Sequence, residues 1–155
     1  MGFNIAGIIV NKKISETEIE SILEFNIKFL KEVDFEEATS SFRDENTVDI
    51  LQTDTGTLLI TELGQIYDLE NSLNETIQFM ISDVSDTYYF EKFTDGQLVR
   101  KYITTQGETV EDFGEGYISE DEDLIDTVWE LVDTYLKNDF SNNIMDQRFK
   151  RYNIE

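Results

Sequence analysis

The chain lacks three residue types altogether: cysteine, histidine and proline. Without cysteine there is no disulfide and no thiolate nucleophile, so the fold must be held by its own core. Without histidine the chain has neither the usual general base nor the commonest metal ligand. Without proline it can form no cis-proline turn and no polyproline segment.

Basic residues are scarce, and this limits the partners that the chain can bind. Its 12 Lys and Arg stand against 34 Asp and Glu, which gives a net charge of −22. Nucleic acids and anionic membrane surfaces are bound through clustered basic side chains, so we expect neither as a partner. The natural complement of such a surface is a basic protein.

The hydrophobic content shows that this acidity is not a sign of disorder. The 155 residues are 39% hydrophobic and 12% aromatic, which is enough for a real core in one domain, residues 1–155. The apolar start, residues 1–10, is too short to span a bilayer and no basic residue precedes it. We therefore expect a cytoplasmic protein without a targeting segment.

The clearest local pattern is a hairpin in residues 86–115. Asp95-Gly96 separates two runs rich in aromatic and β-branched residues, which is the strongest short hairpin signal. A third strand is expected over Thr109–Phe113. Because large apolar residues occur on both faces of the hairpin, we expect it to form the central pair of a sheet with a helix on one face.

Other segments are typical of strands or loops. Residues 3–10 predict a buried first strand, and further strands are expected over 48–52, 57–61 and 76–82. Residues 34–46 indicate a loop or a short edge strand. Residues 62–75 are ambiguous, because Ser72 and Glu75 could cap a short helix. The tail, 141–155, fits either a closing strand or a short helix.

Two longer segments have helical periodicity. Ser15 and Glu18 form a capping box before the first helix, predicted over 16–33, in which Phe25 and Phe29 widen the apolar stripe. Ser119 and Glu122 form a second box before a helix over 120–137, whose apolar face includes Trp129. The predicted fold class is α+β, a mostly antiparallel sheet of five to seven strands with these two helices packed on it.

The acidic residues concentrate in one part of the chain. Between Thr105 and Phe140 there are twelve of them against the single base Lys137. We predict a partner-binding surface there, next to Gly114 and Gly116, where a partner can approach the backbone closely. Its residues are Glu111, Asp112, Glu115, Glu120, Asp121, Glu122 and Asp123. The alternative is that these carboxylates only favour the helix macrodipole and keep the chain soluble.

No pattern of catalytic or metal-binding residues stands out. No nucleophile–base spacing, EF-hand loop, phosphate loop or dinucleotide fingerprint is present, so we expect no enzyme, no metal and no cofactor. Arg100, in the middle of a predicted strand, could bind an anionic ligand. A salt bridge to an acidic neighbour across the sheet, such as Glu91 or Glu111, is the favoured interpretation.

The run from Phe90 to Arg100, the segment Glu111–Glu115, the acidic start of the last helix and the closing Arg151-Tyr152 carry a resemblance. Over residues 77–155 the chain resembles small acidic bacterial proteins of unknown function, some of which are proposed as immunity proteins of polymorphic toxin systems. The resemblance implies a toxin domain as partner and no catalytic residue.

The leading hypothesis is thus a non-enzymatic acidic protein that neutralises a basic protein partner, an immunity protein being its most specific form. Two alternatives stay open: an enzyme that depends on carboxylates or a metal, and a structural or scaffold module.

Overall fold

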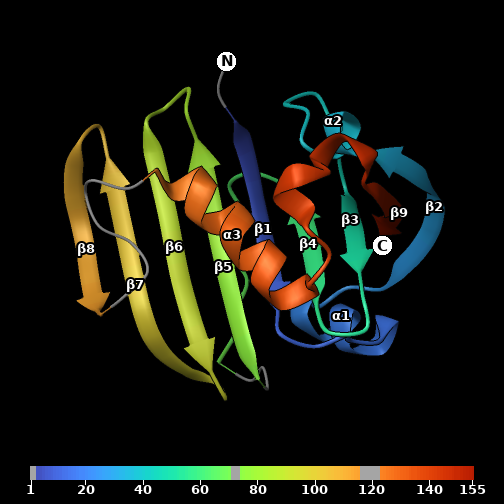
Figure 1. Ribbon diagram of the computed structural model, residues 1–155, viewed down its shortest axis with the longest axis horizontal. Coiled ribbons are helices and arrows are strands. Elements are labelled where there is room, and N and C mark those ends of the chain that lie inside the picture. Colours follow the sequence, from blue (N-terminus) through green and yellow to red (C-terminus); the bar gives the residue numbers. More distant parts are fainter. Residues whose placement is uncertain (1–2, 71–73, 116–122) are drawn as a thin grey trace.

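The computed structural model describes residues 3–70, 74–115 and 123–155. They form one antiparallel sheet of nine strands in the order β2-β9-β3-β4-β1-β5-β6-β7-β8, with helices on both faces (Figure 1). The predicted sheet of five to seven strands is therefore wrong, and the protein is a mostly-sheet fold with short helices. The sheet contains two strands more than the upper bound because β2 and β9 extend it at one end.

The bounds of the elements follow the chain. The strands are β1 Asn4–Val10, β2 Ile27–Asp34, β3 Thr47–Gln52, β4 Thr57–Thr61, β5 Glu75–Ser82, β6 Thr87–Thr94, β7 Gln97–Thr105, β8 Glu108–Gly114 and β9 Arg148–Ile154. The helices are α1 Glu16–Leu23, α2 Phe35–Ala38 and α3 Leu124–Leu136, followed by short 3-10 turns at Phe140–Asn142 and Ile144–Asp146.

Strand β1 lies at the centre of the sheet, paired with β4 on one side and β5 on the other. Its side chains supply both faces: Ile5 and Ile9 enter one hydrophobic cluster, and Ile8 and Val10 enter the other. A strand covered on both faces needs apolar residues at successive positions, which explains its unbroken apolar run. The predicted buried first strand is confirmed.

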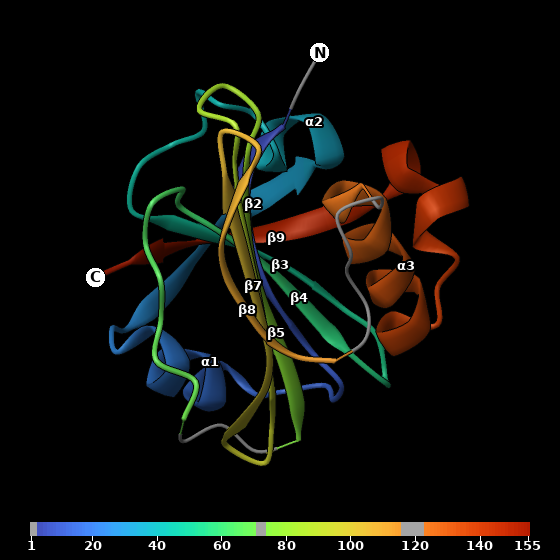
Figure 2. The same cartoon turned by 90° about the vertical axis from the view of Figure 1, so that its left-hand side faces the viewer.

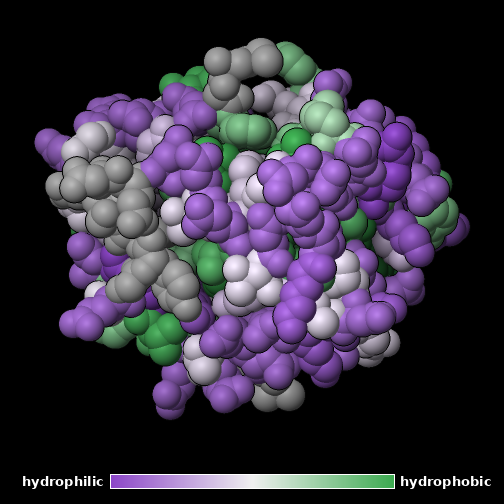
Figure 3. Space-filling view, viewed as in Figure 1, coloured by the Kyte–Doolittle hydropathy of each residue, from purple (hydrophilic) through white to green (hydrophobic). Residues whose placement is uncertain are grey.

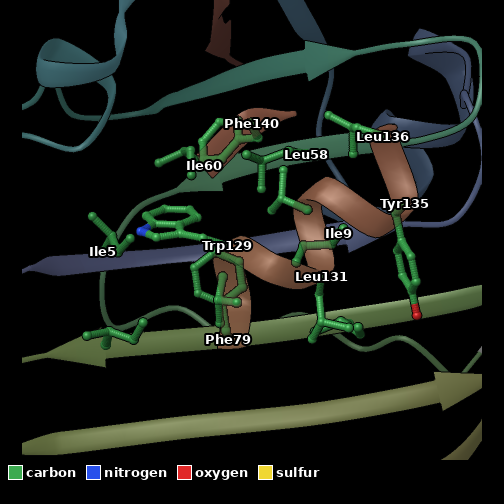
Figure 4. Packing of buried hydrophobic residues seen from close by; sticks show 14 of the residues in the cluster. Ile5, Ile9, Leu58, Ile60, Phe79, Trp129, Leu131, Tyr135, Leu136 and Phe140 are labelled. Atoms are coloured by element: carbon green, nitrogen blue, oxygen red, sulfur yellow. The ribbon is translucent and has the colours of Figure 1, made fainter. Parts of the chain in front are cut away.

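Helix α3 covers one face of the sheet, across β4, β1 and β5 (Figure 1). Figure 4 shows its apolar side chains directed at the strands, with Trp129 beside Ile5 and Ile60. The Trp129 side chain is buried, and its ring meets those of Phe3 and Phe35 edge to face. This confirms the predicted place of Trp129 between the second helix and the sheet.

Helix α1 covers the other face, as the side view in Figure 2 shows. Ile19 and Leu23 from this helix pack with Leu59 of β4 and with Tyr67 and Leu69 of the segment after β4. The sheet therefore separates two hydrophobic clusters, one under α3 and one under α1.

The helix predicted over 16–33 is wrong in its second half. The capping box of Ser15 and Glu18 forms, but α1 ends at Leu23, and Glu24 takes the left-handed conformation with φ of 62°. Glu20 then accepts a hydrogen bond from the Ile27 amide, and the chain continues as β2 alongside β9. The apolar residues at 27–33 fit a strand because β9 pairs with them, a partner that lies far away in the sequence.

The predicted hairpin is confirmed, but it is not central. Asp95 and Gly96 have φ of 49° and 81° and join β6 to β7, with β8 as the third strand. Positive φ at both turn residues is what a two-residue type I′ turn requires. In the sheet β6 and β7 are the seventh and eighth strands, next to the edge. The centre belongs to β1 because β2, β3, β4 and β9 all lie on its other side.

The remaining predicted segments include a loop, two strands and the second helix. Residues 34–46 contain α2 and a loop, without an edge strand. The strand predicted over 76–82 is confirmed as β5. The tail forms β9, which lies between β2 and β3 in the sheet. The second predicted helix corresponds to α3, with Asp123 as its N-cap. The capping boxes predicted at Ser72 and Glu75 and at Ser119 and Glu122 each include positions outside the described residues.

Candidate partner-binding surface

The predicted acidic surface is only partly visible. Glu120, Asp121 and Glu122 lie outside the described residues. Glu111 and Asp112 are neighbours in β8, so their side chains leave on opposite faces of the sheet. The Glu111 carboxylate lies 3.7 Å from Lys101 Nζ, and the Asp112 carboxylate lies 2.5 Å from Arg100 Nη1. Each is thus already engaged in an ion pair with β7.

Glu115 and Asp123, the two remaining described members of the predicted site, lie near opposite ends of strands β6 and β7. Glu115 follows Gly114, which pairs with Arg100 close to the turn between β6 and β7. Asp123 caps α3 by accepting a hydrogen bond from the Ile125 amide, and it acts electrostatically on Tyr88 at the start of β6. The described residues of the predicted site therefore form no single patch, and its binding role stays a prediction.

Arg100 forms the predicted salt bridge to an acidic neighbour across the sheet, and that neighbour is Asp112. Besides Asp112, it donates to the Phe113 carbonyl at 2.8 Å and lies 5.2 Å above the ring of Tyr102. Glu91, one predicted partner, is buried on the other face, where it accepts from Gln78 Nε2 at 2.6 Å. The prediction of Glu91 or Glu111 is wrong because the side-chain alternation places both on the opposite face from Arg100.

A cleft of about 610 Å³ lies at the end of the sheet where β1 begins and β4 and β5 end. Three exposed apolar side chains line it: Phe42 from the loop after α2, Leu63 after β4, and Val84 from the turn between β5 and β6. Their exposed fractions are 95%, 43% and 86%, which is unusual for residues of this kind. Sequence reasoning missed them because they come from three separate loops.

The rim of this cleft is acidic. Asp44, Glu45 and Glu62 line it. Arg43 is the one basic side chain among the described residues that line the cleft, and it pairs with Asp49 at 2.8 Å. The face seen in Figure 3 is mostly hydrophilic, and the chain carries 34 acidic against 12 basic residues. The cleft therefore combines exposed apolar groups with a negative surround.

The loop that carries Phe42 is held by a buried network of charges. Asp49 of β3 is completely buried, and Arg151 of β9 donates two hydrogen bonds of 2.7 and 2.9 Å to its carboxylate. Arg151 also contacts Asp44 at 3.1 Å and Glu37 at 3.3 Å. The hydrogen bond to Asp49 is the main cause that raises the pKa of the Arg151 guanidinium. These contacts attach α2 and the following loop to the sheet.

The turn that carries Val84 is held in a similar way. Asp83 accepts a hydrogen bond from the Phe3 amide and another from the Tyr88 hydroxyl, both at 2.6 Å. The hydrogen bond to Asp83, together with burial and the nearby carboxylates, raises the pKa of Tyr88 to about 12. Both sides of the cleft are therefore anchored to the sheet by carboxylates.

The described residues contain no cluster of three or more Asp or Glu side chains placed to hold a metal ion. Within the same residues no helix is long and apolar enough to cross a membrane. Comparison of the chain with protein-family models, with curated proteins and with solved structures found no match.

Proposed function

We propose that this protein is a non-enzymatic, cytoplasmic binding protein that neutralises a basic protein partner, an immunity protein of a bacterial toxin system being the most specific form of this function. The observation that supports it is the cleft at the end of the sheet. Phe42 and Val84 stand almost fully exposed there, surrounded by Asp44, Glu45 and Glu62. Protein interfaces commonly place an aromatic anchor within a polar rim.

The charge of the rim selects the partner. A surface of this sign attracts a basic protein and repels an acidic one, and steering of this kind raises association rates above the roughly 10⁵–10⁶ M⁻¹s⁻¹ of an unsteered pair. Exposed apolar side chains then supply the burial that keeps the complex together.

The anchoring of the loop also favours binding. Ordering a flexible loop on association costs about 0.5–1.5 kcal/mol for each side chain that is immobilised. The contacts of Arg151 with Asp44 and Glu37 hold the backbone around Phe42 before a partner arrives. Because this backbone is already ordered, less binding free energy is lost to ordering the loop when the partner associates.

The test uses the basic product of a neighbouring gene as partner, with binding measured by calorimetry. Phe42→Ala should weaken the complex by about 2 kcal/mol, or roughly thirtyfold. Phe25→Ala is the matched control, because Phe25 is 51% exposed and lies by the far end of α1. Equal affinities of Phe42→Ala and the parent would contradict the proposal.

The acidic segment predicted from the sequence needs its own test. The variant with Glu120, Asp121 and Glu122 changed to Gln or Asn, and Asp123 to Asn, removes four charges. Asparagine caps a helix about as well as aspartate, so α3 should keep its N-terminus. A slower association with a weaker salt dependence is expected if this segment contributes to steering. An unchanged rate would leave the cleft as the site.

A further inference from the structure

We propose that the edge strand β8 accepts an extended, lysine- or arginine-rich segment of the partner as a tenth strand of the sheet. This inference rests on the proposed function and names the second way in which the partner is held. It concerns the edge of the sheet, which is distinct from the cleft.

Strand β8 forms one edge of the sheet. Within the described residues it is the last strand in the order, and its ladder is with β7. All seven of its residues are exposed, and Figure 2, which faces this edge, shows β8 at the front. A strand in this position presents backbone N–H and C=O groups along its outer side, which is the template for strand addition.

The charge of β8 decides which kind of strand can pair with it. Strand β8 carries Glu108, Glu111 and Asp112, Glu115 follows it, and no basic residue occurs between Tyr102 and Glu115. A second copy of this chain would place carboxylates opposite carboxylates, which is unfavourable across strands. A cationic strand would instead meet the exposed carboxylates of Glu108 and Glu115, which form no ion pair within the described residues. The Glu111 and Asp112 carboxylates already pair with Lys101 and Arg100 of β7.

The exposed apolar residues of β8 add contact area. Val110 is 65% exposed and Phe113 is 50% exposed. The ladder with β7 shifts register between Ile103 and Thr104, after which Glu111–Gly114 pair regularly. The segment best placed to receive a strand is therefore Glu111–Phe113.

The opposite edge of the sheet lacks this combination. Strand β2 carries the exposed bases Lys28 and Lys31, and its ladder with β9 shifts register between Phe29 and Lys31. Exposed lysine is one of the features by which edge strands avoid pairing. The two lysines of β2 are balanced by Glu32 and Asp34, so this edge offers a cationic segment no net attraction, and charge distinguishes the two edges.

The experiment uses a short labelled peptide of alternating lysine and valine, with fluorescence anisotropy as readout. Its control has the same sequence and charge but carries N-methyl groups on amides of both edges of the peptide, so neither edge can pair with a strand. We expect the unmodified peptide to bind at least about tenfold more tightly, because two or three ladder hydrogen bonds are lost in the control. Amide hydrogen exchange at Glu111–Phe113 should slow only with the unmodified peptide.

A pair of charge variants locates the site. Glu108→Lys with Glu115→Lys should weaken peptide binding markedly, whereas Glu32→Lys with Glu36→Lys, an equal charge change at other exposed positions, should weaken it much less. Equal binding of the two peptides, or equal binding of the peptide by the two variants, would show that the attraction is only electrostatic. Either result would overturn the proposal, and so would the absence of any binding. Phe42→Ala, tested with the protein partner, reports on the cleft separately.

Discussion

Asp49 is the residue on which the described charge network depends most. Its carboxylate is fully buried and receives hydrogen bonds from both Arg151 and Arg43. A buried carboxylate between two guanidinium groups is stable only while the charges balance, because each is costly to bury alone. The chain has few basic residues, and two of its arginines are bound inside the molecule at this point.

Asp49→Asn should therefore destabilise the fold by about 3–5 kcal/mol. It keeps the shape but removes the counter-charge of Arg43 and leaves Arg151 with Glu37 and Asp44 alone among the described residues. Urea denaturation measures this change. Glu45→Gln, at an exposed position in the nearby loop, is the control and should stay within about 0.5 kcal/mol of the parent. A small effect of Asp49→Asn would mean that water or Glu37 and Asp44 replace the lost charge.

Trp129 and Phe42 make a matched pair of aromatic residues with opposite roles. Trp129 is 8% exposed within the core under α3, and Phe42 is 95% exposed. Trp129→Ala should cost about 3–5 kcal/mol of unfolding free energy, and Phe42→Ala should cost less than about 0.5 kcal/mol. Thermal and urea melts of both variants test the contrast. Similar losses in the two would contradict the assignment of Phe42 as a binding residue.

Tyr88 gives a prediction for alkaline pH. Its pKa is raised from 10.0 to about 12, because its hydroxyl donates to Asp83. The folded state therefore keeps a proton that the unfolded state releases between these values. The stabilisation is complete below about pH 10 and is lost as the pH rises toward about 12.

Tyr88→Phe should make the loss of stability over this pH range smaller than in the parent. Absorbance at the tyrosinate band follows the titration, and urea melts at several pH values follow the stability. The other tyrosines with raised pKa, Tyr67, Tyr89 and Tyr152, remain in the variant. Parallel pH profiles for the variant and the parent would show that the hydrogen bond to Asp83 does not persist in solution.

Among the elements, the central strand β1 is closely packed at Gly7. A Cβ at Gly7 would lie 2.5 Å from the Leu59 carbonyl oxygen and 2.7 Å from Phe79 Cζ. The carbonyl belongs to the neighbouring strand β4 and cannot move without disturbing the ladder. Glycine is therefore required at this position by close approach, although its φ is ordinary.

Gly7→Ala should destabilise the protein by about 1–3 kcal/mol, the usual cost of overpacking a core. The midpoint of urea denaturation is the measurement, with far-UV circular dichroism to show that the sheet persists. Alanine also removes backbone freedom from the unfolded chain, which acts in the opposite direction by less than about 1 kcal/mol. An unchanged midpoint would mean that β1 and β4 lie farther apart than described.

At the scale of the whole molecule, the excess of carboxylates dominates. Several of the 12 basic residues are engaged in ion pairs, Lys92 with Glu75 and Lys12 with Glu18 among them. With 34 acidic against 12 basic residues, the carboxylates far outnumber their possible basic partners, and their mutual repulsion acts against the compact state.

Added salt should raise the melting temperature at neutral pH. Between about 0.01 M and 0.15 M the screening length falls from roughly 30 Å to 8 Å, so most of the gain should come in this range. Differential scanning calorimetry at constant pH measures it. A melting temperature that is flat or falls with salt would show that local ion pairs outweigh the general repulsion.

Features that depend on near neighbours could be predicted from the sequence. The Asp95-Gly96 turn, the Ser15–Glu18 capping box and the burial of Trp129 follow from turn chemistry, helix capping and periodicity, which act over a few residues. Features that depend on distant partners could not be predicted in this way. Residues 27–34 became a strand because β9, at the other end of the chain, pairs with them.

The candidate site was decided in the same way. Phe42, Leu63 and Val84 meet at one cleft only because the ends of β1, β4 and β5 bring their loops together. Glu111 and Asp112, adjacent in the sequence, were separated because a strand directs successive side chains to opposite faces. Long-range strand pairing contributes free energy that no local sequence pattern contains. For this reason only the folded chain shows which acidic residues surround an apolar surface. It also shows which of them are internal partners of arginine and lysine.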